Sequence, residues 1–287
     1  MAKNNNKKHY RTIWLSDIHL GSRGCQADHV LDFLKHHECD TLYLVGDIID
    51  GWQLKNKVFW LQSHTNVLRK FLTLAKNDTR VIFVTGNHDE FLRRYEGKHF
   101  GNIYIVNHIE HTTSDGRRLL VIHGDQFDAV TRYYGWLAHL GSQGYDFLIW
   151  LNMVFNKIRS RYGYGYWSLS QFLKNKVKGA VNFISEYEVF VAKAAKKRNL
   201  DGVVCGHIHH AEIRDIDGVA YYNCGDWVES CTALVEDEQG NISIINWAQG
   251  RVSLKKDKPD ETNDSDEGED LFDLINGSTS SNVSHKS

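Results

Sequence analysis

The 287-residue sequence has no long apolar run, since 18 or more consecutive apolar side chains occur nowhere in it. A helix that spans a membrane needs about 20 mainly apolar residues, so we expect no membrane span. The first ten residues are polar and basic, and no apolar run follows them. This pattern argues against a cleaved secretory signal, and we expect a cytoplasmic protein.

Cysteine is scarce, and its spacing suggests no paired arrangement. The five cysteines are an odd number without any CxxC spacing, and they are Cys25, Cys39, Cys205, Cys224 and Cys231. A disulfide framework needs paired cysteines in an oxidising compartment, and a structural zinc site needs closely spaced thiolates. We therefore expect five reduced thiols that fill space in the interior.

The charge is small but unevenly distributed. The whole chain carries −2, whereas residues 257–287 hold nine acidic and two basic side chains, together with the only proline, Pro259. This tail has too little apolar content to offset the entropy of ordering, so we expect it to be disordered. With 41% hydrophobic residues, the remaining residues 1–256 are long enough to form one domain around a large core.

Hydrophobic periodicity indicates an α/β protein. The segments RTIWLSD, TLYLVGD and RVIFVTGNHD each contain a short β-branched apolar run. A helical pattern follows the first over 28–37 and the second over 58–76, and a short polar helix follows the third. Further strands are predicted at residues 102–106, 117–123, 202–205, 219–222, 232–235 and 242–245. Because the late strands follow one another without long helices, we expect mixed sheets.

Residues 129–199 do not follow this alternation of strands and helices, because their periodicity is helical throughout. They contain 15 of the 34 aromatic residues, and eleven Lys or Arg against three acidic residues. We interpret this segment as a helical cap inserted into the α/β body, although its aromatics could simply form a helix-packing core. The run 145–155 could lie in a membrane headgroup boundary, or it could be a buried helix or a dimer contact.

Polar clusters follow five of the predicted strands directly. They are Asp17-Ile18-His19, Gly46-Asp47, Gly86-Asn87-His88-Asp89, His123-Gly124-Asp125 and Gly206-His207-Ile208-His209. Each cluster alone has an ordinary explanation as a turn or a helix cap. Ligands of open α/β sheets bind at strand ends, so the five clusters together predict one shared metal site.

The residue types in these clusters define the metal chemistry. Carboxylate, amide and imidazole ligands without thiolate suit hard to borderline divalent ions, so manganese is the first expectation and iron or zinc would also fit. Two such ions can clamp the attacking and leaving oxygens of a phosphoryl group. A ligand that bridges both ions must be anionic, and Asp47 suits that role.

The motifs DIH, GDIID, GNHDE, HGD and GHIHH, in this order over residues 11 to about 248, resemble those of the calcineurin-like metallophosphoesterase superfamily. The resemblance implies a β-sandwich of mixed sheets flanked by helices. It implies one ion held by Asp17, His19, Asp47 and His209, and a second held by Asp47, Asn87, His123 and His207. His88 would then stabilise the transition state or protonate the leaving oxygen, with Asp89 orienting it, and Asn87 would also contact the substrate.

A narrower resemblance lies in the helical insertion and in the segment YNCGDWVES at 222–230. Both are similar to the branch that hydrolyses UDP-2,3-diacylglucosamine in lipid A synthesis. That branch releases UMP and a diacylglucosamine 1-phosphate, which implies a nucleotide-linked lipid substrate and a peripheral contact with the inner membrane. Ser168, Lys174 and Lys178 are candidates for phosphate contacts, since the two lysines are spaced i, i+4, but a solvated basic face would have the same pattern.

One departure keeps other substrates open. The lipid A enzymes carry arginine after the asparagine of their GN-x-D motif, where this sequence has His88. A general phosphodiesterase or phosphatase that acts on another phospholipid, nucleotide or nucleic acid is the main alternative. A nucleic-acid-binding module with a basic aromatic cap does not need a ligand set, and a catalytically inactive scaffold should have lost some of the seven ligand positions, all of which are present. The oligomeric state stays undetermined.

Overall fold

Strands and helices alternate at the start of the chain. The computed structural model describes residues 7–127, 152–162 and 178–248, all within one unit, Met1–Ser253. The first elements are β1 (Lys8–Leu15), α1 (Ala27–His36), β2 (His37–Val45), α2 (Gly51–Asn56), α3 (Gln62–Lys76) and β3 (Arg80–Val84). The predicted α/β class is confirmed, because the three apolar runs form the three strands.

The rest of the described chain adds shorter strands and one long helix. These elements are the 3₁₀ helix η1 (Glu90–Tyr95), β4 (His99–Phe100), β5 (Ile103–Val106), β6 (His108–Thr112), β7 (Arg118–Ile122), η2 (Asp125–Phe127), α8 (Lys178–Lys197), β8 (Gly202–Cys205), β9 (Glu212–Ile216), β10 (Val219–Asn223), β11 (Thr232–Glu236) and β12 (Ile242–Asn246). Residues 152–161 are also helical.

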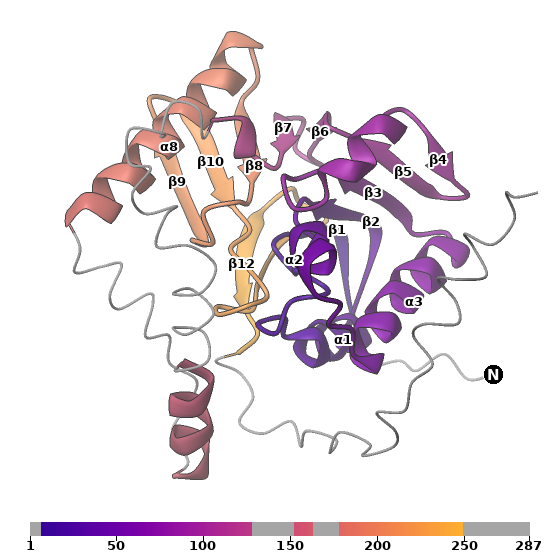
Figure 1. Cartoon of the computed structure of the whole chain (residues 1–287). Coiled ribbons are helices and arrows are strands. Elements are labelled where there is room, and N and C mark those ends of the chain that lie inside the picture. Colours follow the sequence, from indigo (N-terminus) through magenta and orange to yellow (C-terminus); the bar gives the residue numbers. More distant parts are fainter. Residues whose placement is uncertain (1–6, 128–151, 163–177, 249–287) are drawn as a thin grey trace, which may run out of the picture. The chain divides into compact units, whose positions relative to one another are not determined.

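The strands form two mixed sheets (Figure 1). The seven-stranded sheet has the order β12-β11-β1-β2-β3-β5-β4, and β1, β2, β3 and β5 run parallel in it while β11 is antiparallel to β1. The five-stranded sheet has the order β6-β7-β8-β10-β9, with β7, β8 and β10 parallel. Helices α1 and α3 contact the first sheet, and α8 contacts the second.

Alternating side chains place the two sheets face to face. On β1, Ile13 and Leu15 belong to the core beneath the helices α1 and α3, whereas Trp14 points into the core between the sheets. On β7, Leu119 faces the same inner core, and Leu120 faces α8. Since successive strand residues point to opposite faces, each sheet is apolar on both sides. The layers are therefore helix, sheet, sheet, helix, as the family resemblance implied.

Several elements differ from the sequence expectations. Helix α3 begins at Gln62 rather than at Val58, and a separate short helix, α2, precedes it. Strands β6 and β9 were not predicted, and both are edges of the five-stranded sheet. Their sequences, HIEHT and EIRDI, are largely exposed and polar, so they lack the apolar run that marks a buried strand.

The segment predicted as a helical cap is described only in part. Within α8, Tyr187, Val191 and Ala195 are buried against the five-stranded sheet, so this half of the helix belongs to the layered body. Ser168, Lys174, most of the run 145–155 and the tail 257–287 lie outside the described residues, and so does the side chain of Lys178. No helix in the described ranges is long and apolar enough to cross a membrane. All five cysteines are free thiols, as expected.

Candidate active site

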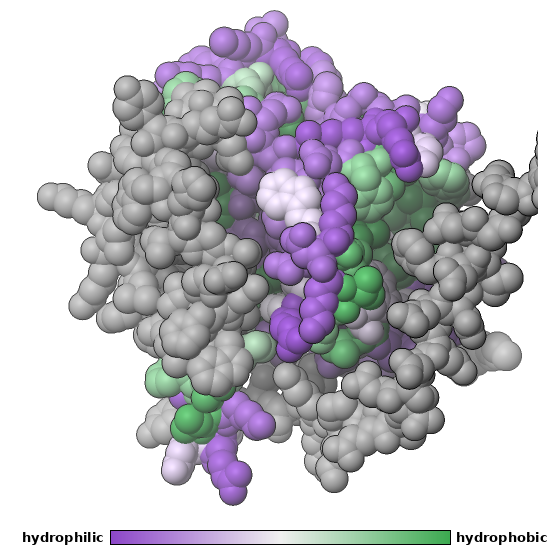
Figure 2. Space-filling model, in the orientation of Figure 1, coloured by the Kyte–Doolittle hydropathy of each residue, from purple (hydrophilic) through white to green (hydrophobic). Residues whose placement is uncertain are grey.

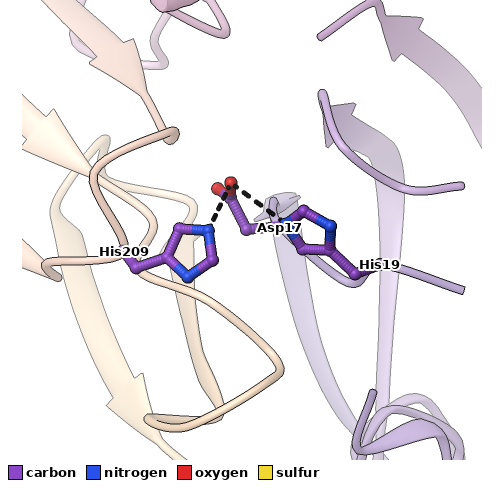
Figure 3. Close-up of side chains that lie close together, drawn as sticks. All are labelled: Asp17, His19 and His209. Carbon is purple, nitrogen blue, oxygen red and sulfur yellow. Dashed lines mark ion pairs between the residues drawn. The ribbon is translucent and has the colours of Figure 1, made fainter. Parts of the chain in front are cut away.

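The five polar clusters meet where the two sheets present the ends of their parallel strands. Asp17 and His19 follow β1, Asp47 follows β2, Asn87 follows β3, His123 follows β7, and His207 and His209 follow β8. Figure 3 shows Asp17 between His19, from its own loop, and His209, from the opposite sheet. The layered fold thus brings together residues that are almost 200 positions apart in the sequence.

The backbone at these residues adopts an unfavourable conformation. Nine non-glycine residues of the described chain have positive φ, and five of them are the predicted ligands Asp17 (52°), His19 (53°), Asp47 (53°), His207 (70°) and His209 (53°). The left-handed region is uncommon for residues with a Cβ atom and costs about 1 to 3 kcal/mol each. Such strain clusters at functional sites, and five of these nine residues are predicted metal ligands.

Two glycines allow the ligand loops to approach one another. A Cβ atom on Gly86 would collide with the Asp47 carboxylate and backbone, and with the His123 ring. A Cβ atom on Gly206 would lie 2.5 Å from Asp17 Oδ2. Any side chain at either position would therefore push a predicted ligand away from its neighbours.

Asp17 is the centre of the first group. Its Oδ1 atom lies 3.1 Å from His209 Nε2 and 4.0 Å from His19 Nε2. Its Oδ2 atom accepts a hydrogen bond of 3.0 Å from the backbone N–H of His207, so one carboxylate joins the two sheets. Burial alone would raise the pKa of Asp17, but interactions with His209 and His123 together outweigh it and lower that pKa to about 2. The carboxylate is therefore ionised at neutral pH, as a metal ligand must be.

Asp47 lies between the two groups. Its Oδ2 atom is 3.3 Å from His123 Nε2 and 3.9 Å from His19 Nε2, while Oδ1 accepts from the backbone N–H of His88 at 2.8 Å. Ligand atoms of Asp47, His123 and His207 all lie within 4.8 Å of one another. Burial would lower the pKa of His123, but the Asp47 carboxylate raises it well above its usual range. This intermediate position is the one that a bridging carboxylate needs.

Unsatisfied ligand atoms point to a cation. Asp17 Oδ1, His19 Nε2, Asn87 Oδ1 and His123 Nε2 are buried and make no hydrogen bond of good geometry with any described residue, although Asp17 Oδ1 and His123 Nε2 lie within ion-pair distance of His209 and Asp47. An unsatisfied buried polar atom costs about 1 to 3 kcal/mol, so four of them in one site need a partner. The opposite ring nitrogens are held: His19 Nδ1 by Asp50 Oδ2 at 3.2 Å, and His123 Nδ1 by the Val45 carbonyl at 3.0 Å. Each Nε2 lone pair therefore faces the centre, and the donor set fits divalent cations.

His88 is oriented by Asp50, and the expectation that Asp89 orients it is wrong. His88 Nδ1 lies 2.9 Å from Asp50 Oδ1, within hydrogen-bond distance. The Asp89 carboxylate instead accepts from the backbone N–H groups of Ile48 and Gly86. Burial, together with the charge of Asp47, raises the pKa of Asp89 to about 6. Asp89 thus connects the β2 and β3 loops.

Asp50 itself was missed by the sequence analysis. Its two oxygens contact two different imidazoles, those of His19 and His88, and Oδ1 also caps α2 by accepting from the backbone N–H of Gln53. The available signal was the second aspartate of GDIID, three residues after Asp47. That spacing does not reveal a partner 38 residues away, so only the structure identifies this contact.

An α/β sandwich with buried carboxylate, imidazole and amide ligands at its strand ends is the scaffold of a metal-dependent hydrolase. Residues 10–211 match the model of the family described as calcineurin-like phosphoesterase. The match covers well over half of the chain, and the chain belongs to this family. It is accordingly a hydrolase of phosphoric esters or pyrophosphates, in a family that binds divalent metals.

Similar proteins extend the comparison beyond the family. A Neisseria gonorrhoeae protein named UDP-2,3-diacylglucosamine hydrolase is 25% identical over 247 residues, which cover 81% of this chain and 97% of that protein. A Shewanella pealeana protein of the same name is 22% identical over 84% of this chain and 100% of its own. Among solved structures, Yfce, a phosphoesterase from E. coli, covers 82% of this chain and 98% of its own, with 16% identity and a TM-score of 0.41.

Proposed function

We propose that this hydrolase cleaves the pyrophosphate of a UDP-linked acylated glucosamine, such as UDP-2,3-diacylglucosamine, to UMP and a lipid sugar 1-phosphate. The chemistry is supported above all by the four unsatisfied ligand atoms in one buried site. The substrate is supported by the similarity to proteins named UDP-2,3-diacylglucosamine hydrolase, which extends over 97% to 100% of their length.

The residues would hold two divalent ions, with manganese favoured by the mixed oxygen and nitrogen donors and iron or zinc also suited. The first ion would take Asp17, His19, Asp47 and His209, and the second Asp47, Asn87, His123 and His207. When bound, the ions would polarise the phosphoryl oxygens and activate a water molecule. Asp47 would contact both, since its carboxylate already lies between His19 and His123.

His88 would act on the leaving oxygen. Asp50 holds its Nδ1 atom, so the other ring nitrogen, Nε2, is directed to the site and lies 4.0 Å from Asp47 Oδ2. From there Nε2 can donate a proton to the oxygen that departs, or stabilise its developing charge. The backbone N–H of the same residue donates to Asp47, which ties the position of His88 to that of the bridging carboxylate.

The identity of His88 also favours a second candidate, a general phosphodiesterase or phosphatase. The lipid A enzymes that this chain resembles carry arginine at this position, whereas an imidazole suits proton donation to many leaving groups. The two candidates share the metal site and differ only in the substrate. Contact of the helical insertion with a lipid or with the inner membrane stays a prediction, because Ser168 and Lys174 lie outside the described ranges and the side chain of Lys178 is not described.

Two measurements separate the candidates. The metal-stripped protein, reconstituted with Mn²⁺, should release UMP from UDP-2,3-diacylglucosamine in detergent micelles, and it should act on bis(p-nitrophenyl) phosphate with a much lower kcat/KM. If the diester is the better substrate, the general phosphodiesterase assignment replaces the proposed one. If neither substrate is hydrolysed with any of Mn²⁺, Fe²⁺ or Zn²⁺, the assigned chemistry is wrong.

A further inference from the structure

An exposed tryptophan lies directly beside the proposed proton donor. Trp52, on α2, has its ring centroid 4.2 Å from that of His88, with an angle of 34° between the ring planes. Despite its large apolar ring, Trp52 is 43% exposed, and the neighbouring Phe91 is 38% exposed. Two exposed aromatic side chains at the edge of a catalytic site are unexplained by packing alone.

The backbone holds this ring in place relative to His88. The N–H of Gly51, the residue before Trp52, donates to the carbonyl of His88 at 2.9 Å. A Cβ atom on Gly51 would lie 2.8 Å from that carbonyl and 3.0 Å from the Phe91 ring, so only glycine permits this approach. Asp50 caps α2 and holds His88 Nδ1. Trp52 and His88 are therefore positioned by one set of contacts.

One face of the Trp52 ring remains available. The imidazole lies against one face, and Trp52 Nε1 lies 3.5 Å from Glu90 Oε1, at the limit of a hydrogen bond. Trp52 nevertheless stays 43% exposed, so the ring keeps surface on which a ligand could pack. In Figure 2, which has the orientation of Figure 1, the surface around α2 mixes hydrophilic and apolar side chains. Such a surface suits a flat ring that is apolar on its faces and polar at its edge.

The position of His88 determines which part of a substrate reaches Trp52. If His88 serves the leaving oxygen, the group attached to that oxygen has to pass beside the imidazole, and hence beside the adjoining indole. We propose that Trp52 is a substrate-binding residue on which a ring of the leaving half packs, either the flat nucleobase or the apolar face of the glucosamine pyranose. This inference rests on the proposed function and deepens it, because it assigns a specificity residue to the leaving half.

Binding of product fragments tests the proposal on the full-length, Mn²⁺-loaded protein. Isothermal titration calorimetry would measure Kd for UMP, N-acetylglucosamine 1-phosphate and inorganic phosphate with the unmodified protein, Trp52→Ala and Trp52→Phe. Stacking on an aromatic side chain corresponds to at least about a fivefold change in Kd. We expect Trp52→Ala to weaken one ring-bearing ligand by that factor, Trp52→Phe to restore most of the loss, and phosphate binding to stay unchanged. The ring that is affected identifies the leaving half.

Two results would overturn the proposal. Equal weakening of all three ligands would mean that Trp52 only positions His88 and the metal ligands, and no weakening of either ring-bearing ligand would mean that its exposed face binds no ring. Phe100→Ala is the matched control, since Phe100 is 60% exposed on the edge strand β4 and should leave every Kd unchanged. Failure here would leave UMP release from the lipid intact, so it is distinguishable from failure of the proposed function.

Discussion

Asp50→Asn tests the link between the metal site and the proton donor. The Asp50 carboxylate is buried and contacts His19 Nδ1 at 3.2 Å and His88 Nδ1 at 2.9 Å. An asparagine has one acceptor oxygen, so it can serve only one of the two imidazoles as a hydrogen-bond acceptor. The substitution should therefore impair either the metal ligand His19 or the proton donor His88, while both rings remain present.

The magnitude follows from these contacts. Loss of a residue that orients a metal-bound histidine typically costs about 10- to 100-fold in metal affinity or activity. Removal of the imidazole at His88 should cost about 10²- to 10⁴-fold in rate. We expect Asp50→Asn to lower kcat by about 10- to 100-fold, thus less than His88→Ala. The cap of α2 should survive, because asparagine caps a helix N-terminus about as well as aspartate.

The assay combines turnover with metal content. Hydrolysis of bis(p-nitrophenyl) phosphate at saturating Mn²⁺ would give kcat, and elemental analysis would give the metal bound per chain. Asp40→Asn is a matched control, because Asp40 contacts His9 at 3.1 Å on the exposed surface and should leave both quantities unchanged. An Asp50→Asn protein with unaltered kcat and unaltered metal content would refute the positioning role.

Four further outcomes are expected. EDTA should abolish hydrolysis, and Mn²⁺ should restore it. Asp47→Ala should lose metal and activity together. His88→Ala should keep its metal and lose activity, and a metal-free His88→Ala protein would contradict the role given to His88. Truncation after Gly250 should leave turnover of a soluble diester unchanged, and a large loss would show that the tail contributes to the site. Burial alone would raise the pKa of Glu236, but hydrogen bonds from His111, Thr12 and Ser114 lower it to about 2. The pKa of Glu236 in the folded protein is therefore below its ordinary value of 4.5. The interactions of its carboxylate then contribute about 3 kcal/mol to the free energy of unfolding above pH 4.5, and this contribution is lost as the pH falls toward 2. Glu236→Gln should flatten this dependence in urea unfolding, and an unchanged slope would contradict the assignment.

The sequence predicted those parts of the fold that bury apolar residues. β1, β2 and β3 are largely apolar where they cross the core, so their apolar runs mark them directly, and the polar clusters mark where they end. The edge strands β6 and β9 have no such mark, because one side of each faces solvent and the other pairs with a single neighbour. They become strands because they pair with a neighbouring strand in the assembled sheet, and the hydrophobic pattern of their own residues does not reveal that pairing.

The candidate ligands were predictable for a related reason. Parallel strands present their carboxyl ends at one edge of the sheet, so polar residues directly after such strands lie close to one another at that edge. The positive φ values at Asp17, His19 and Asp47 were not predictable, because aspartate and histidine tolerate the left-handed region better than most residues but adopt it in only a minority of cases. They arise where the assembled loops hold the backbone against its own preference.

The sequence alone does not show whether Asp50 or Asp89 is the partner of the His88 imidazole. Asp89 is adjacent to His88 in the sequence, yet its carboxylate bonds the backbone of Gly86 and Ile48, so it faces the interior of the loop pair. Asp50 reaches His88 because the Gly51 N–H bonds the His88 carbonyl and draws the start of α2 against the β3 loop. That approach requires a residue without a side chain at position 51. The same contact that selects Asp50 as the partner of His88 also places Trp52 against its ring, so proton donation and recognition of the leaving group would depend on one glycine.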